Sequence, residues 1–460
     1  MKKTFISILI GLANLFAVNE TLAQDDDTTF VAVAGNAEDI SWEADDRQGS
    51  IRCDSVVFAA VYTSSDEPDS LYEAGLRRQL RIELYLNESF NRVDTVKLVT
   101  WSKMFPPFGP RNCKAELLDE TGKVIRDLES TVVFRPVPFD RQVLMVNVGG
   151  LDGYRIRLSY DIVGTVNIFR HFHKDNLNKV EWFSNELDQF VPPSGVVYDR
   201  IAVRNDTDGT VFLSSCRDNK NVEENLKDVQ FVLVDTNEVV IRKHVVGDVF
   251  YSIYLIDSPT LQKFEKIRER FNAGMEVLLA GSEVAKSFDI VTACWNIANV
   301  GGMGRGFGNF ILCDTSFASS TVSLIHESIH ILYPFREKKA SKAKYFIGES
   351  LVEWVAHYVV FGRFSQDMSQ FDFSETSLYE IDVNNSKTFN YLYNKGPHII
   401  QQFADNTDPA LLKNAILHFF ILNKNTDVGY EHFLQYLSNF FPEEEIRLLD
   451  ERVKNKSHIE

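Results

Sequence analysis

Two histidines stand four residues apart in His326-Glu327-Ser328-Ile329-His330, so a helix would place both imidazoles on one face. Leucines and isoleucines flank this segment on most sides, which predicts a buried helix over residues 319–333. Buried imidazoles beside a carboxylate need polar partners, and a zinc ion can bind both ring nitrogens at ~2.0–2.1 Å. The glutamate between them is placed to accept a proton from water. The alternative, two polar residues on an ordinary helix surface, fits the apolar flanks less well.

A third metal ligand is expected on the next predicted helix, which covers residues 346–361. Glu349 lies 19 residues after His330, and two helices joined by a basic loop would bring it opposite the histidine pair. Glu353, one turn further on, is predicted to accept a hydrogen bond from a ligand histidine and to fix its tautomer. We therefore predict one Zn²⁺ bound by His326, His330 and Glu349, with a fourth position left for water.

The spacing of apolar residues along the chain changes near residue 258, which predicts two domains and an α+β fold class. Residues 24–257 contain short alternating or β-branched runs separated by turn signals, a pattern typical of an all-β, sandwich-like domain. From 258 to 460 the apolar period becomes helical, with a small sheet expected from strands at 288–297 and 310–313. The remaining helices are predicted at 387–406, 408–423, 429–440 and 443–454.

The first 23 residues have the pattern of a secretory signal peptide. Lys2 and Lys3 precede an apolar run from 5 to 18, and Thr21-Leu22-Ala23 supplies small residues before the expected cleavage point. This pattern predicts an exported protein, periplasmic or extracellular, although an uncleaved N-terminal anchor is the alternative. No later run approaches ~20 apolar residues, so no stable membrane insertion is expected.

Charge and cysteine content narrow the classes of partner and site. The formal net charge of −17 argues against nucleic acid as a partner, because such partners require a positive surface. The five cysteines include no C-x-x-C pair, which excludes a zinc ribbon, and their odd number leaves at least one thiol unpaired. The oligomeric state is left open.

The spacing of the three predicted ligands resembles that of the aminopeptidase N family of gluzincins, which includes leukotriene hydrolase. Tyr393-Asn394-Lys395-Gly396, at the start of a long predicted helix, is similar to the family's Tyr-x-Lys-Gly. Gly301-Gly302-Met303, about 25 residues before the histidines, resembles the beginning of the family's G-[AG]-M-E-N edge strand. Together these matches cover residues 258–440.

The resemblance implies a thermolysin-like catalytic domain that hydrolyses peptide bonds, with a peptide or protein as its partner. It implies that Glu327 is the general base and that Tyr393 stabilises the oxyanion of the tetrahedral intermediate. It also implies that Gly301, Gly302 and Met303, with the residues that follow them, hold an extended substrate. A plain glycine-rich hairpin is the alternative interpretation of this segment.

One departure from the family pattern concerns the free amino group of the substrate. Gly304 and Arg305 stand where the family has Glu-Asn, and that glutamate holds the substrate's α-amino group. Strict aminopeptidase specificity is therefore not implied, and Arg305 suggests recognition of an acidic side chain or a carboxylate. Two other functions stay open: a catalytically silent peptide-binding protein on the same fold, and a non-peptidase zinc hydrolase such as an epoxide hydrolase. The presence of both Glu327 and Tyr393 weighs against the silent protein.

Overall fold

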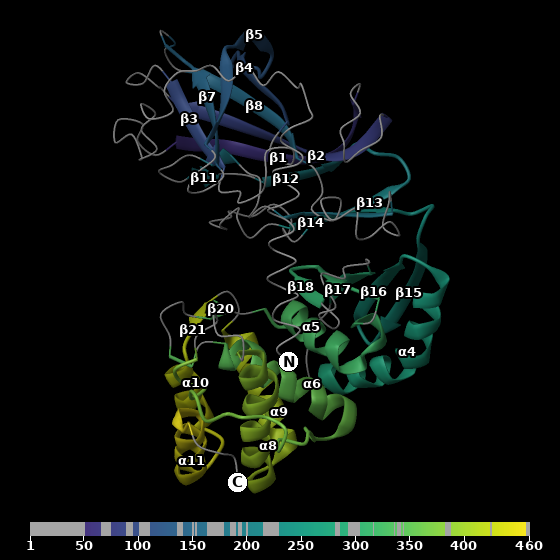
Figure 1. Cartoon of the computed structure of the whole chain (residues 1–460), viewed down its shortest axis with the longest axis vertical. Helices are drawn as coiled ribbons and strands as arrows, with labels where there is room; N and C mark the ends of the chain where they lie inside the picture. The colour runs from purple at the N-terminus through teal and green to yellow at the C-terminus, as the bar shows by residue number, and fades with distance from the viewer. Residues whose placement is uncertain are drawn as a thin grey trace, which may run out of the picture. The chain divides into compact units, whose positions relative to one another are not determined.

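The computed structural model describes 51–65, 75–88, 95–100, 111–135, 141–149, 151, 154–162, 179–184, 190–191, 196–198, 201–214, 230–280, 286–292, 304–315, 317–334, 336–337, 342–343, 345–381, 388–423 and 426–456. The chain divides into two compact units, the first taking residues up to Asn237 and the second beginning at Glu238 (Figure 1). The predicted signal peptide lies outside the described residues, so it stays a prediction. None of the described helices combines the length and the apolar character needed to cross a bilayer.

The described residues of the first unit form three sheets. Its seven-stranded sheet has the order β11-β1-β2-β8-β4-β5 with β12 also pairing with β1; the other two have the orders β10-β3-β7-β6 and β13-β14-β9. The strands are β1 (Ile51–Ser65), β2 (Gly75–Glu88), β3 (Thr95–Thr100), β4 (Arg111–Leu118), β5 (Val124–Leu128), β6 (Ser130–Arg135), β7 (Arg141–Asn147), β8 (Tyr154–Ile162), β9 (Val180–Ser184), β10 (Phe190–Val191), β11 (Val196–Tyr198), β12 (Ile201–Asn205), β13 (Thr210–Ser214) and β14 (Gln230–Asp235).

Alternating apolar side chains from these sheets meet in one core, which includes Phe58, Leu144 and Phe231. The rings of Phe58 on β1 and Phe231 on β14 are 4.6 Å apart between centroids, so β14 packs against the largest sheet.

Cys113 in this unit and Cys313 in the second carry free thiols. The pairing of the other cysteines was not predicted.

The second unit contains a five-stranded sheet with the order β15-β16-β17-β19-β18 and a two-stranded parallel pair, β20-β21. The strands are β15 (Val240–Val246), β16 (Val249–Leu255), β17 (Lys286–Thr292), β18 (Gly304–Phe307), β19 (Phe310–Cys313), β20 (Arg336–Glu337) and β21 (Asp427–Val428). We expected the first domain to extend to residue 257, whereas β15 and β16 pair with β17 in the sheet of the second unit. Alternation of apolar residues indicates which face of a strand is buried, but it does not indicate which sheet the strand joins.

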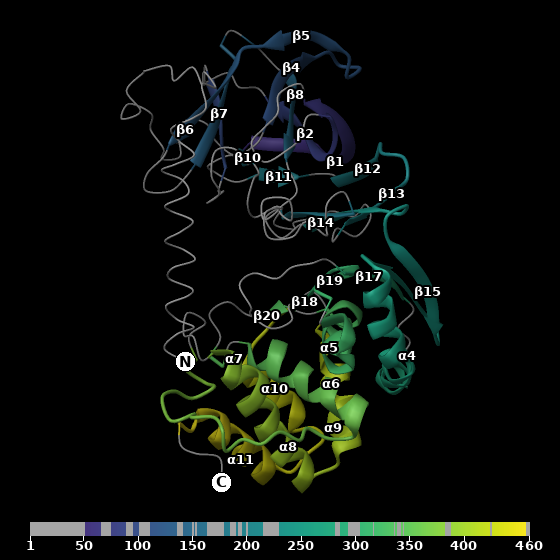
Figure 2. The ribbon, with the colours of Figure 1, turned by 45° about the vertical axis from the view of Figure 1, so that its right-hand side comes forward.

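The other elements among the described residues of the second unit are helices (Figure 2). They are α4 (Ser258–Leu279), η5 (Phe317–Ser319), α5 (Thr321–Leu332), η6 (Phe346–Leu351), α6 (Val352–Phe361), α7 (Thr388–Asn390), η7 (Tyr391–Lys395), α8 (Gly396–Asn406), α9 (Pro409–Leu422), α10 (Tyr430–Leu437) and α11 (Glu443–Lys454). Side-chain oxygens cap α4, α5 and α9, since Asp257, Ser320 and Asp408 each accept a hydrogen bond from a backbone N–H of the first turn. Mixed helices and sheets agree with the predicted α+β class.

The central core of this unit lies between the sheet and helices α4, α5 and α6. Tyr251 and Ile253 of β16 and Ile325 of α5 belong to it and are fully buried. Gly274 of α4 permits a close approach, because a Cβ there would stand 3.2 Å from the Ile325 side chain. This packing buries α5 on most sides and sets the position of its two histidines.

Candidate metal centre

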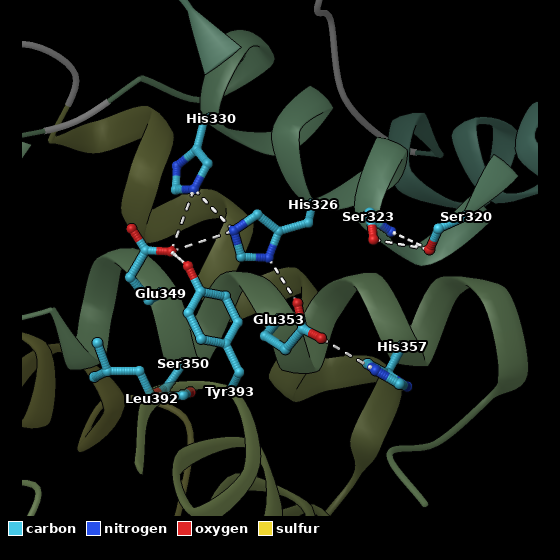
Figure 3. A network of polar contacts seen from close by, with 10 residues as sticks. All are labelled: Ser320, Ser323, His326, His330, Glu349, Ser350, Glu353, His357, Leu392 and Tyr393. Carbon is cyan, nitrogen blue, oxygen red and sulfur yellow. Dashed lines mark hydrogen bonds and ion pairs between the residues drawn. The ribbon is translucent and has the colours of Figure 1, made fainter. Parts of the chain in front are cut away.

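Three helical segments bring the polar side chains of the site together (Figure 3). His326 and His330 come from α5, Glu349 from η6 and Tyr393 from η7. Both η6 and η7 are π-helical, and each continues directly into an α-helix, α6 and α8 respectively. Single π-helical turns of this kind occur often at functional sites, because the wider turn changes where a side chain points. Here each of the two turns carries one polar residue of the cluster.

The distances between the predicted ligand atoms fit one tetrahedral metal ion. His330 Nε2 lies 3.1 Å from His326 Nε2, and Glu349 Oε2 lies 3.3 Å from His326 Nε2 and 3.9 Å from His330 Nε2. Two ligands at ~2.0–2.1 Å from a tetrahedral zinc ion would be roughly 3.3 Å apart. The cluster of His326, His330 and Glu349 could therefore hold a metal ion, and all three ligand atoms lie within 4.8 Å of one another.

Glu353 sets the orientation of the first histidine. Its Oε2 lies 2.8 Å from His326 Nδ1, which leaves Nε2 of that ring to face the ligand cluster. The other oxygen, Oε1, lies 3.2 Å from His357 Nε2, one turn further along α6. A carboxylate on the far nitrogen of a ligand histidine is a common arrangement in metal sites, where it fixes the tautomer and the ring plane.

The charges of the site favour a cation between these groups. Burial alone would lower the pKa of His326, but the carboxylates of Glu349 and Glu353 outweigh it and raise that pKa well above its ordinary value. Burial opposes ionisation of the two glutamates, yet the hydrogen bond to His326 brings the pKa of each to about 2. Both glutamates therefore stay charged over the whole working range of pH, and a proton or a metal ion can balance their negative charges.

Glu327 is buried on α5 and contacts the edge of the sheet. The backbone N–H of Gly306 on β18 donates a hydrogen bond of 2.5 Å to Glu327 Oε2. A Cβ at Gly306 would stand 3.2 Å from that oxygen and 3.1 Å from the Glu327 carbonyl, so a glycine allows this close approach. Edge strand β18 thereby orients the carboxylate that lies in sequence between the two histidines.

Tyr393 joins the cluster through its hydroxyl group. The hydroxyl donates a hydrogen bond of 2.6 Å to Glu349 Oε2, the oxygen nearest to His326 Nε2. The ring lies 5.7 Å from the His326 ring and stacks on Phe389 at 5.1 Å between centroids. Burial, followed by the charge of Glu349, raises the pKa of Tyr393 well above its ordinary value, so this residue is a hydrogen-bond donor.

Gly396 sets the spacing between the two π-helical turns. A Cβ at Gly396 would overlap the side chain of Ser350, the residue after Glu349. Ser350 itself donates a hydrogen bond of 2.8 Å to the carbonyl of Leu392, next to Tyr393. The glycine of the Tyr-Asn-Lys-Gly segment therefore lets the backbone that carries Glu349 lie directly against the backbone that carries Tyr393.

Gly396→Ala is expected to destabilise the protein by about 1–3 kcal/mol, because the added methyl group has no space beside Ser350. The effect opposes helix propensity, which favours alanine over glycine by ~1 kcal/mol. Urea unfolding of the wild type, G396A, S350G and the double variant measures it. Because Ser350→Gly removes the overlapping atoms, the double variant should be less destabilised than the sum of the single variants. An additive loss would contradict the proposed contact.

The structure brings some of the predicted site residues together and does not describe others. It brings His326, His330, Glu349, Glu353 and Tyr393 together and places Glu327 on the same helix as the histidines.

Of the predicted substrate-binding segment, Gly301, Gly302 and Met303 lie outside the described residues. Gly304 and Arg305 open β18, where their backbones pair with Cys313 and Leu312 of β19. Residues 304–313 therefore form a glycine-rich hairpin, and Gly308 has the positive φ of 55° that its turn requires.

Two contacts of the site were not predicted from sequence. One is the hydrogen bond from Gly306, for which the alternation of glycines on the strand was the available signal. The other is the contact of His357 with Glu353. The spacing of four residues between them was the signal for this contact.

Comparison with solved structures shows a likeness of fold. An aminopeptidase N family protein from Idiomarina loihiensis matches with a TM-score of 0.53 and 10% identity, over 88% of this chain and 76% of that chain. A two-domain M1 zinc metallopeptidase variant bound to L-arginine matches with a TM-score of 0.50 and 10% identity, over 89% and 95%. An M1 zinc metallopeptidase variant from Deinococcus radiodurans with a Tyr-Ser-Ala substrate gives 0.49 and 10%, over 90% and 96%. No family model and no curated protein sequence matches the chain.

Proposed function

We propose that this chain is an exported zinc metallopeptidase that binds one Zn²⁺ through His326, His330 and Glu349. The observation that carries the proposal is the convergence of these three ligand atoms within 4.8 Å. Two imidazole nitrogens and one carboxylate oxygen are the ligand set of a catalytic zinc site, which keeps its fourth position open. When bound, Zn²⁺ lowers the pKa of water and polarises a carbonyl oxygen.

The side chains of the site would perform the remaining steps of peptide hydrolysis. Glu327, oriented by the Gly306 N–H, would take a proton from the attacking water and pass it to the nitrogen of the leaving amine. Tyr393 would donate its hydroxyl proton in a hydrogen bond to the oxygen of the scissile carbonyl as negative charge develops there. Glu353 would hold His326 in the tautomer that leaves Nε2 for the metal.

We propose that the chain consists of a β-rich domain followed by a thermolysin-like catalytic domain; the likeness of fold to a two-domain M1 zinc metallopeptidase supports a division into two domains. Because β15 and β16 pair within the second sheet, the catalytic domain would begin near residue 238, and not at 258. Residues 1–23 would be a signal peptide, and the protein would act in the periplasm or outside the cell.

The substrate-binding residues would come from the glycine-rich hairpin. Strand β18 is the last strand of this sheet among the described residues, and an extended peptide could pair with it as a further strand. Gly304 and Arg305 replace the acidic residue expected for amine recognition, so peptides without a free α-amino group would also be cleaved. The presence of a hydrogen-bonded Glu327 favours an enzyme over a silent binding protein.

Zinc analysis combined with peptide digestion tests this proposal. We expect about one zinc ion per chain, removal of activity by a chelator and its recovery when Zn²⁺ is added back. Paired peptides with free and acetylated N-termini should both be cleaved, at rates that differ by less than about tenfold, since one missing contact is worth ~1 kcal/mol. Absence of bound metal would refute the central claim, and zinc without cleavage would favour the binding protein.

A further inference from the structure

A second histidine contacts the carboxylate that orients His326. Glu353 lies between two imidazole rings in Figure 3: its Oε2 lies 2.8 Å from His326 Nδ1 and its Oε1 lies 3.2 Å from His357 Nε2. Each oxygen of the carboxylate therefore has its own ring nitrogen. The i, i+4 spacing on α6 places Glu353 and His357 on the same helix face.

The His357 ring is itself held in place by neighbouring aromatic rings. It makes an edge-to-face contact with Phe364 at 4.8 Å and lies 5.9 Å from Phe361. Phe364 is buried, and the His357 side chain is 20% exposed. The ring is therefore a fixed hydrogen-bond donor at the far side of Glu353.

A carboxylate needs such a second contact to keep its plane. The last torsion of a glutamate side chain has a broad, roughly two-fold preference, so one hydrogen bond leaves the carboxylate free to rotate about it. A second bond to the other oxygen sets the plane and aims Oε2 at His326 Nδ1. The direction of Nε2 of His326 toward the ligand cluster then depends on both bonds.

We infer that His357 is a positioning residue of the zinc site, acting through Glu353 on the ligand His326. This inference rests on the proposed zinc site and deepens it. An ordinary surface pair on a helix would affect only the stability of the fold. A positioning role instead predicts a change in metal affinity, since loss of a group that orients a ligand typically weakens binding 10–100-fold.

The test is the zinc dissociation constant of the full-length protein, measured by competition with a chromophoric chelator at one fixed pH. His357→Phe keeps the ring contacts with Phe361 and Phe364 but removes the N–H, and it should weaken zinc binding by about tenfold. His357→Gln places an amide N–H near the position of Nε2 and should remain within about threefold of the wild type. His418→Leu, which removes a histidine far along the chain on α9, should leave zinc affinity unchanged.

A double-variant cycle makes the test independent of folding effects. In the Glu353→Ala background there is no carboxylate to orient, so His357→Phe should cause no further loss of zinc affinity. Equal affinity in the wild type and H357F, or equal losses in H357F and H357Q, would overturn the inference. So would additive losses in the cycle. A wild-type protein that binds no zinc would instead refute the proposed function.

Discussion

Glu327→Gln is expected to lower kcat/KM for peptide hydrolysis by about 10³-fold or more while zinc stays bound. General acid–base catalysis contributes ~10²–10⁴-fold, and a glutamine cannot take the proton from water. A 10³-fold loss corresponds to ~4 kcal/mol of transition-state stabilisation. The amide is nearly isosteric with the carboxylate, and its oxygen can still accept the hydrogen bond from the Gly306 N–H. Single-turnover peptide cleavage measures the effect.

Two controls separate a catalytic loss from a structural one. The zinc content and the midpoint of urea unfolding of E327Q should equal those of the wild type, because Glu327 is not among the proposed ligands. Glu276→Gln neutralises an exposed glutamate on α4 and should leave activity unchanged. If E327Q retained activity within tenfold of the wild type, Glu327 would not be the general base.

The positions of these helices were predictable from the sequence, but the π-helical turns within them were not. The helix expected over 346–361 has these bounds, yet its first part is the π-helical η6 and only the remainder, α6, is α-helical. The helix expected over 387–406 is likewise divided into α7, η7 and α8. Apolar periodicity cannot distinguish one π-helical turn from an α-helical turn, because it averages over several turns. The two π-helical turns depend on packing between segments far apart in the sequence, such as Gly396 against Ser350.

The approach of the three proposed ligand residues to one another was easier to predict than the contacts around them. The spacing of His326 and His330 is a local property of one helix, and Glu349 follows at a recognisable distance. The contact from Gly306 to Glu327 joins the edge of the sheet to a helix, and no pattern within either segment specifies that distance.

Tyr393→Phe is expected to lower kcat by about 10²–10³-fold, the usual cost of removing one donor to a developing oxyanion. The substitution removes only the hydroxyl group, and the ring contacts with His326 and Phe389 remain. The wild-type hydroxyl stays protonated at working pH because burial and Glu349 raise the pKa of Tyr393. Steady-state kinetics on one peptide should therefore show a fall in kcat with little change in KM.

The hydrogen bond from Tyr393 to Glu349 allows a second explanation that the same variant can exclude. The hydroxyl donates to Glu349 Oε2, the oxygen proposed to bind the metal, so it could act by holding that ligand. In that case Y393F would weaken zinc binding 10–100-fold, and excess Zn²⁺ would restore much of the lost activity. A donor to the oxyanion instead predicts an unchanged zinc dissociation constant and a loss of kcat that persists at saturating zinc. A carboxylate oxygen binds zinc directly in catalytic sites, so Glu349 does not depend on a donor to the same oxygen to act as a ligand. We therefore expect the catalytic outcome, and a loss of activity that zinc reverses would contradict it.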